Sequence, residues 1–249
     1  LETSLNNLKT DYIDIYQFHN PSFCPKPGDG TGLYEAMLEA KAQGKIHFIG
    51  LTNHRLPVAI EACESGLYDT IQFPFSYLAD QKDIDLVHKC KENNIGFICM
   101  KALSGGLINR SDAAYAYLAQ FDNVLPIWGI QKESELDEFI SYQTKAPELT
   151  QEIQDLIAHD RKELAGDFCR GCGYCMPCPK GIQINQCARM SLMLRRAPAA
   201  SWLNEHWQNE MKKIEECLNC GKCMTKCPYH LNTPELLKKN YKDYKTFLK

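Results

Sequence analysis

Short apolar segments recur along the first two thirds of the chain, and each is followed by a turn and an amphipathic stretch. The segments are nearly continuous in hydrophobicity and rich in β-branched and aromatic residues, which is typical of parallel strands buried on both faces. The five strands predicted in this way cover residues 12–18, 47–51, 70–75, 96–100 and 124–129.

Amphipathic stretches predict a helix after each strand, and several have the expected start and stop residues. Gly44 follows the first helix, and Ser111 and Ser134 precede the last two. The predicted helices cover residues 32–42, 56–65, 83–93, 111–120 and 134–142. The alternation predicts an α/β fold. Its five βα units form either part of a TIM barrel, which needs eight units, or an open doubly wound sheet.

The strand pattern stops near residue 145, and a charged helix over residues 152–165 leads into a cysteine-rich part. Beyond Cys169 only helical stretches are evident, such as residues 186–196 and 202–217. We therefore predict three parts, which are a partial barrel over residues 1–145, a helical linker over 146–168 and a small α-helical domain over 169–249.

Composition and charge exclude some classes of partner. The formal net charge of −3 over 249 residues gives no basic face for nucleic acid. The longest apolar run, near residues 46–51, is too short to cross a membrane. The chain opens on Leu1 without the pattern of a secretory signal, so we expect it to be truncated at its N-terminus. Clustered cysteines of this kind are kept as thiols in a cytoplasm, which is the expected location.

Nine of the thirteen cysteines lie in the C-terminal third, mostly in two groups. The second group has the C-x2-C-x2-C-x3-C-P spacing of bacterial ferredoxins, and the first is shorter by one residue before its last cysteine. Two such groups predict two 4Fe-4S clusters. The predicted ligands are Cys169, Cys172, Cys175, Cys178, Cys217, Cys220, Cys223 and Cys227.

The assignment of the cysteines leaves alternatives. Structural zinc also uses C-x2-C pairs, although a triple of thiolates on one loop suits the corner of a cubane better. The irregular first group makes Cys187 a rival of Cys178, but a buried helix residue is the simpler interpretation of Cys187. Because the fourth cysteine of a ferredoxin motif usually reaches the other cluster, we expect Cys227 to join the first group and Cys178 the second.

The N-terminal part resembles the aldo/keto reductases. Residues 1–19, LETSLNNLKTDYIDIYQFH, resemble a helix and strand of that family, and GKIHFIGLTN at 44–53 resembles its next strand. Ile71-Gln72-Phe73 is similar to the strand after that. The resemblance covers roughly residues 1–141. Together with the cysteines, it identifies the chain as similar to the aldo/keto reductases that carry a ferredoxin-like tail.

The resemblance implies a TIM barrel that binds NADP(H) and reduces carbonyls by hydride transfer, using an Asp, Tyr, Lys and His tetrad. His19 matches the tetrad's histidine and stands at the C-terminal end of a predicted strand, where it would orient a substrate carbonyl. The other tetrad members would lie upstream of Leu1. We therefore expect this chain by itself to be inactive.

The resemblance also implies contacts with the cofactor. Thr52 and Asn53 look like the pair that holds the nicotinamide carboxamide, and Gln72 looks like its glutamine partner. Met100 stands where the family stacks a tyrosine on the nicotinamide. Lys101 and the Gly105-Gly106 turn are the candidates for a pyrophosphate contact. The arginine expected for a 2′-phosphate is not evident, which leaves NADP(H), NAD(H) and a flavin open.

We predict an iron–sulfur oxidoreductase of the aldo/keto reductase family, which couples nicotinamide-dependent carbonyl or alcohol chemistry to electron transfer through two 4Fe-4S clusters. Its expected partners are a small carbonyl or alcohol and a redox partner protein. Two other functions remain open. One is a non-enzymatic electron-transfer module with the barrel as a docking platform, and the other is a zinc-stabilised interaction protein.

Overall fold

The computed structural model describes residues 1–164, 168–196 and 199–248, which form two compact units. The first unit comprises Leu1–Ala102 and Leu118–Trp128, and the second comprises Leu103–Tyr117 and Gly129–Lys249. These units divide the chain at other points than the predicted boundaries at 145 and 168, which stay a prediction. Residues 165–167 of the predicted linker lie outside the described residues.

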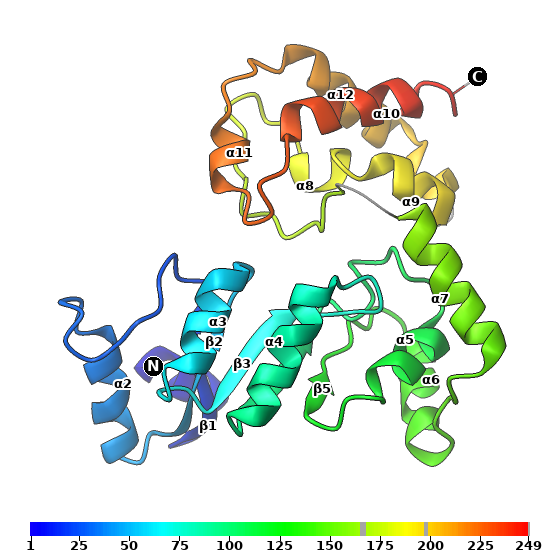
Figure 1. Cartoon of the computed structure of the whole chain (residues 1–249). Helices are drawn as coiled ribbons and strands as arrows, with labels where there is room; N and C mark the ends of the chain where they lie inside the picture. The colour runs from blue at the N-terminus through cyan, green and yellow to red at the C-terminus, as the bar shows by residue number, and fades with distance from the viewer. Residues whose placement is uncertain (165–167, 197–198, 249) are drawn as a thin grey trace. The chain divides into compact units, whose positions relative to one another are not determined.

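A parallel five-stranded sheet forms the centre of the first unit (Figure 1). Its strands lie side by side in chain order, and four helices belong to the same unit. The strands are β1 Ile13–His19, β2 Ile46–Thr52, β3 Thr70–Pro74, β4 Gly96–Met100 and β5 Val124–Pro126. The helices are α1 Glu2–Leu8, α2 Leu33–Ala42, α3 Leu56–Glu64 and α4 Gln81–Glu92.

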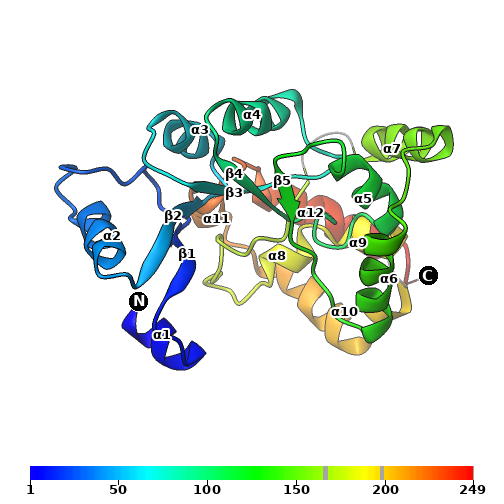
Figure 2. The ribbon, with the colours of Figure 1, turned by 90° about the horizontal axis from the view of Figure 1, so that it is seen from below.

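The strand order decides between the two architectures that the sequence left open. A doubly wound sheet reverses its strand order and carries helices on both faces. Here the order never reverses, and α2, α3 and α4 cover the same face (Figure 2). The sheet is therefore the arc of a barrel, as predicted for the α/β part.

One face of the sheet is buried and the other is open, which corrects the prediction of strands buried on both faces. The helix-covered face holds a core of Ile49, Leu51, Ile71, Phe73, Phe97 and Cys99, each at most 3% exposed. The opposite face carries Ile15, Phe48 and Leu125, which are 38%, 48% and 65% exposed. The strands read as continuous apolar runs because both faces are apolar, but only one is covered within the described residues.

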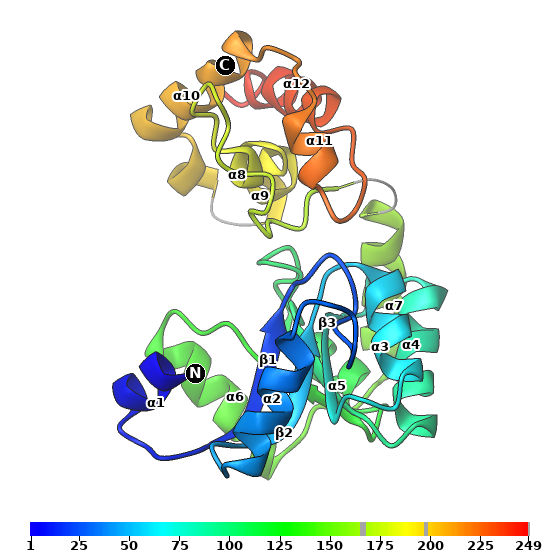
Figure 3. The same cartoon turned by 90° about the vertical axis from the view of Figure 1, so that its left-hand side faces the viewer.

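The second unit consists of helices and loops. The predicted helices 186–196 and 202–217 are both broken into shorter pieces, and α12 was not predicted. Helices α8 to α12 gather into one group (Figure 3). The elements are α5 Ser111–Leu118, α6 Glu133–Thr144, α7 Gln151–Glu163, α8 Ile184–Cys187, α9 Met190–Arg196, η1 Ala199–Trp202, α10 Glu205–Lys212, η2 Lys213–Glu216, α11 Lys222–Lys226 and α12 Thr233–Tyr244.

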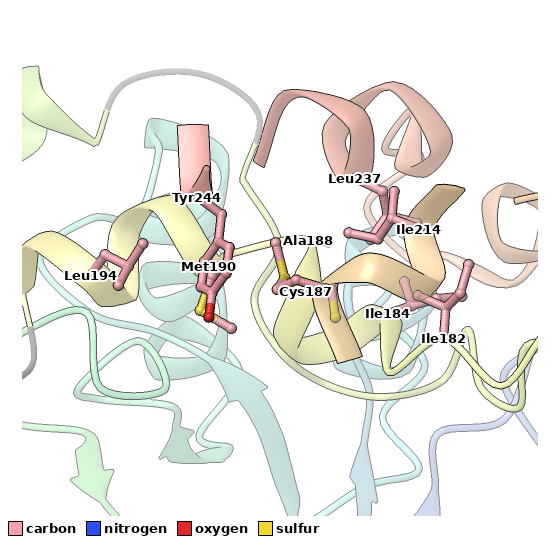
Figure 4. Close-up of a cluster of buried hydrophobic side chains, with 10 residues drawn as sticks. Ile182, Ile184, Cys187, Ala188, Met190, Leu194, Ile214, Leu237 and Tyr244 are labelled. Carbon is pink, nitrogen blue, oxygen red and sulfur yellow. The ribbon is translucent and has the colours of Figure 1, made fainter. Parts of the chain in front are cut away.

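A small core holds these C-terminal helices together (Figure 4). From α12, Leu237 and Tyr244 pack into it, and the Tyr244 hydroxyl donates to the carbonyl of Trp202 at 2.8 Å. Asn240 fixes α12 further, since its amide donates to the carbonyl of Ala188 at 3.1 Å and accepts from the amide of Ser191 at 2.8 Å. The buried core residues are Ile182, Ile184, Cys187, Ala188, Met190, Leu194, Met211, Ile214, Leu237 and Tyr244.

Two arginines of this group hold the loop that follows Ala102, which explains why residues 103–117 belong to the second unit. Arg189 Nη1 donates to the carbonyl of Gly105 at 2.7 Å, and Arg196 Nη1 donates to that of Leu107 at 2.9 Å. Arg196 also pairs with Asp160, and both side chains are at most 7% exposed. No helix among the described residues is long and apolar enough to cross a membrane.

Candidate functional site

Three of the predicted site residues form a row across the carboxyl end of the sheet. His19 is the register partner of Thr52, and Thr52 is the partner of Gln72. Residues in register point to the same face, which here is the open one. His19 is exposed, Thr52 is 8% exposed, and Gln72 accepts a hydrogen bond from Gln17 Nε2 at 2.9 Å. A ligand at this edge could meet an imidazole, a hydroxyl and an amide.

Asn53 has a different environment from its neighbour Thr52. Its side chain is fully buried, its Nδ2 donates to the carbonyl of Pro21 and its Oδ1 accepts from the amide of Arg55, both at 2.8 Å. These bonds tie the loop after β1 to the loop after β2. Asn53 therefore supports the loops that carry the row, and its contact with a nicotinamide stays a prediction.

Lys101 directly follows β4 and is exposed, with a left-handed φ of 60°. Met100 is 9% exposed and pairs in register with Pro74. The Gly105-Gly106 turn belongs to the other unit, where the carbonyl of Gly105 accepts the hydrogen bond from Arg189. The role of Lys101 and this turn at a pyrophosphate stays a prediction.

His54 is a buried residue at the same edge that the sequence analysis missed. Burial lowers its pKa to about 4, and the positive charges of Lys101, His19 and Arg55 act in the same direction. Asn20 Oδ1 accepts from the amide of His54 at 3.2 Å and from Arg55 Nη1 at 3.4 Å. His54 is therefore neutral at pH 7. The signal was its place directly after Asn53 at a strand end.

Four cysteines from both motifs line one cavity in the second unit. They are Cys169, Cys172 and Cys175 of the first motif and Cys227 of the second. The backbone amide of Gly171 donates to the Cys169 sulfur at 3.4 Å. The structure thus brings together the four thiols that crossed pairing predicts for the first cluster.

A second cavity is lined by the remaining thiols. Cys217, Cys220 and Cys223 lie on it together with Cys178, and Cys175 lies between the two cavities. Cys187 lines neither cavity and belongs to the helical core instead. The structure therefore places Cys178, rather than its rival Cys187, with the second motif.

The donor set of both cavities suits iron–sulfur clusters. One cavity is lined by four thiols and the other by five, with Cys175 shared between them, and four thiols are the usual ligand set of a 4Fe-4S cluster. Within the described residues, no group of three or more His, Cys, Asp or Glu side chains could hold a single metal ion. Burial raises the pKa of Cys169 and raises that of Cys175 to about 12. Cluster binding must therefore displace protons from these thiols.

The first unit is thus the arc of a barrel with a polar row at its carboxyl edge, and the second is a helical group with two cavities lined by cysteines. Residues 1–124 match the aldo/keto reductase family, and residues 168–232 match the 4Fe-4S dicluster domain. The N-terminal part of the chain is therefore of the aldo/keto reductase family, and the C-terminal part carries a 4Fe-4S dicluster domain. The family and the iron–sulfur domain predicted from the sequence are confirmed.

Two relatives illustrate the similarity of the reductase part. A methylglyoxal reductase of Salmonella typhi is 39% identical over 92 residues, which are 34% of this chain and 33% of the relative. An NADH-specific methylglyoxal reductase of Escherichia coli is 32% identical over 105 residues, covering 42% of this chain and 32% of that protein. The chain thus spans about a third of the length of these curated relatives.

A solved structure supports the fold. The aldo-keto reductase of Bacillus halodurans in its holo form has a TM-score of 0.53, covers 64% of both chains and is 22% identical. At this identity the likeness shows the α/β barrel-type fold alone, which confirms the predicted fold class.

Proposed function

We propose that this chain is the iron–sulfur part, with a portion of the reductase barrel, of an oxidoreductase that couples nicotinamide-dependent carbonyl or alcohol chemistry to single-electron transfer. The observation that carries the proposal is the presence, in one chain, of the polar row on the sheet and two thiol quartets. A polar row alone would need no clusters, and clusters alone would need no substrate site, so their presence in one chain supports the coupling of the two reactions.

The sheet residues act by binding and orienting. His19 is exposed at the end of β1, where its imidazole would donate a hydrogen bond to a carbonyl oxygen of the substrate. Thr52 and Gln72, in register with it, offer the hydroxyl and amide for a carboxamide. Asn53 holds the two loops in place, and Lys101 offers a charge to a pyrophosphate. A bound nicotinamide would supply the hydride.

The cysteine residues act as ligands in a crossed arrangement. Cys169, Cys172 and Cys175 would share one cluster with Cys227, and Cys217, Cys220 and Cys223 would share the other with Cys178. The lining of the two cavities supports this assignment. Bound clusters would supply one-electron transfer. A hydride carries two electrons, so two clusters that each accept one electron match its stoichiometry, with one proton released.

The substrate class is a small carbonyl compound. Relatives of the reductase part are named methylglyoxal reductases, and one is named NADH-specific. Methylglyoxal is therefore the first substrate to test, and NADH should be tested beside NADPH. A protein that exchanges electrons with the clusters is the expected redox partner.

Anaerobic mixing tests the coupling. The intact protein with its clusters is mixed with NADH or NADPH, and cluster reduction is followed by visible bleaching and electron paramagnetic resonance. We expect bleaching without a mediator and recolouring when methylglyoxal is added. Clusters that dithionite reduces but neither nicotinamide does would favour the docking-platform alternative. Stoichiometric zinc without iron or sulfide would favour the zinc-stabilised protein.

A further inference from the structure

Arg189 lies buried against the first cysteine loop. Arg189 is 8% exposed. Its Nη1 donates to the carbonyl of Gly105 at 2.7 Å, and its Nε donates to Gln186 Oε1 at 3.3 Å. A Cβ built on Gly171 would stand 2.9 Å from Nη1, and one on Gly105 would stand 2.6 Å from it. Only glycine at both positions allows the guanidinium to lie so close to the cysteine loop.

The charge of Arg189 lacks the compensation that its neighbours have. On helix α9, which begins at the next residue, Arg195 pairs with Asp243 and Arg196 pairs with Asp160. Among residues 1–164, 168–196 and 199–248, no carboxylate forms an ion pair with Arg189. A buried cation is costly unless a negative charge lies nearby.

A cluster bound by the first thiol quartet would supply the missing negative charge next to Arg189. Gly171, on which the guanidinium packs, donates its amide to the Cys169 sulfur at 3.4 Å. Ala188, the residue before Arg189, lines the cavity of Cys169, Cys172, Cys175 and Cys227. Arg170 lines the same cavity, with its guanidinium 4.5 Å from the ring centroids of both Phe168 and Tyr229.

The second quartet has weaker cationic surroundings. Lys180 and Lys222 line its cavity. Lys180 pairs with Glu216 at 3.4 Å, and the two side chains are 39% and 62% exposed. Lys222 is exposed as well. Solvent and salt screen such charges far more than they screen a buried one.

We propose that Arg189 is the resident counter-charge of the first cluster and makes that cluster the easier of the two to reduce, so that electrons collect there. This role rests on the proposed binding of two clusters. Reduction adds one electron to a cluster that is already negatively charged, and no bond or proton need change. Arg189 stabilises the added charge, and net charge is one of the factors that set the potential of such clusters.

The test is a redox titration of the intact protein followed by electron paramagnetic resonance, with dithionite as reductant. In Arg189→Gln we expect the equilibrium constant for reduction of one cluster to fall about tenfold, a downward shift of about 59 mV for one electron. The other cluster should keep its potential. Arg189→Lys retains the charge and should keep most of the wild-type potential.

Arg195→Gln is the matched control, since it removes the same charge from the adjacent helix α9, where that charge is paired with Asp243. It should shift neither cluster. Cys220→Ser marks the second cluster, because loss of one of its ligands changes or removes the signal of that cluster. In the double variant with Arg189→Gln, the shifted potential must belong to the unmarked signal.

Several results would overturn the role. They are an unchanged potential in Arg189→Gln, an equal shift of both clusters, or a shift of the marked cluster. If Arg189→Gln fails to assemble a cluster, Arg189→Lys is the deciding variant. It keeps the positive charge, so a potential about 59 mV or more below that of the wild type would exclude electrostatic compensation by Arg189. Iron and sulfide analysis of the wild-type protein separates this outcome from failure of the proposed binding of two clusters, in which case iron and sulfide would be absent.

Discussion

The two units place their candidate site residues in opposite ways. In the first unit, His19, Thr52 and Gln72 meet because neighbouring strands are in register, and a helix-covered core holds that sheet without them. In the second, ten buried residues among those described form the core of the C-terminal helices, and five of the eight candidate thiols pack against it, namely Cys169, Cys175, Cys178, Cys217 and Cys223. The comparison predicts that the sheet folds without a ligand at its site, whereas the helical group depends on its clusters for much of its stability.

Removal of the metal should separate the two units most strongly. We expect the C-terminal helices to lose their cooperative unfolding transition when iron is stripped under anaerobic conditions, because ligation energy, of order 10 kcal/mol in structural zinc domains, is folding energy. The sheet should keep its transition. Calorimetry before and after chelation measures both. Two transitions that persist unchanged would contradict the comparison.

Loss of one crossed ligand should damage the cluster of the other motif. In Cys227→Ser we expect the cluster held by Cys169, Cys172 and Cys175 to be lost, which halves a content of about eight irons per chain. Iron analysis and electron paramagnetic resonance measure this. Cys187→Ala should keep both clusters, because Cys187 lies in the core. Perturbation confined to the cluster of Cys217, Cys220 and Cys223 would show that pairing is not crossed.

His19→Ala tests the opposite dependence in the sheet. Turnover of methylglyoxal is measured in the complete protein, which includes the tetrad residues expected upstream of Leu1. It should fall by about 10²- to 10⁴-fold, because the imidazole acts on the substrate. The free energy of unfolding should change by at most about 0.5 kcal/mol, since the side chain is exposed. His47→Gln is the control, because His47 is another histidine of the sheet at its far end. An unchanged rate in His19→Ala would assign His19 to structure.

The smallest effect concerns a helix end in the first unit. The Asp80 carboxylate accepts from the amide of Asp83 at 3.1 Å and caps α4. Asp80→Ala should lower the free energy of unfolding of the sheet unit by about 1 kcal/mol and leave iron content unchanged. Lys82→Ala, at an exposed position two residues further along, is the control. A lower iron content in Asp80→Ala would show that the units are coupled in stability.

Much of the first unit could be predicted from the sequence. β4 has the predicted limits, and β1, β2 and β3 differ from them by one residue at one or both ends. β5 ends at Pro126, earlier than predicted, although the amide of Ile127 still donates to the carbonyl of Cys99 on β4 at 3.0 Å. α4 begins two residues before the predicted start, since the capping role of Asp80 was not recognised.

Less of the second unit could be predicted. The continuous helix expected over residues 186–196 is interrupted between α8 and α9, and α12 was overlooked. The apolar residues of α12, Leu237 and Tyr244, pack against residues some fifty positions earlier in the chain. Their role depends on these distant partners rather than on the local pattern.

The sequence by itself determined that the five strands are parallel, to which family the reductase part belongs and how the cysteines of the two motifs are spaced. These properties are local, because periodicity and motif spacing act over a few residues. Only the tertiary structure decided that one face of the sheet is open, that Cys175 and Cys227 line one cavity and that Arg189 packs on Gly171. Each of these depends on segments that are distant in the chain and are brought together by the packing of the core, which no local pattern records.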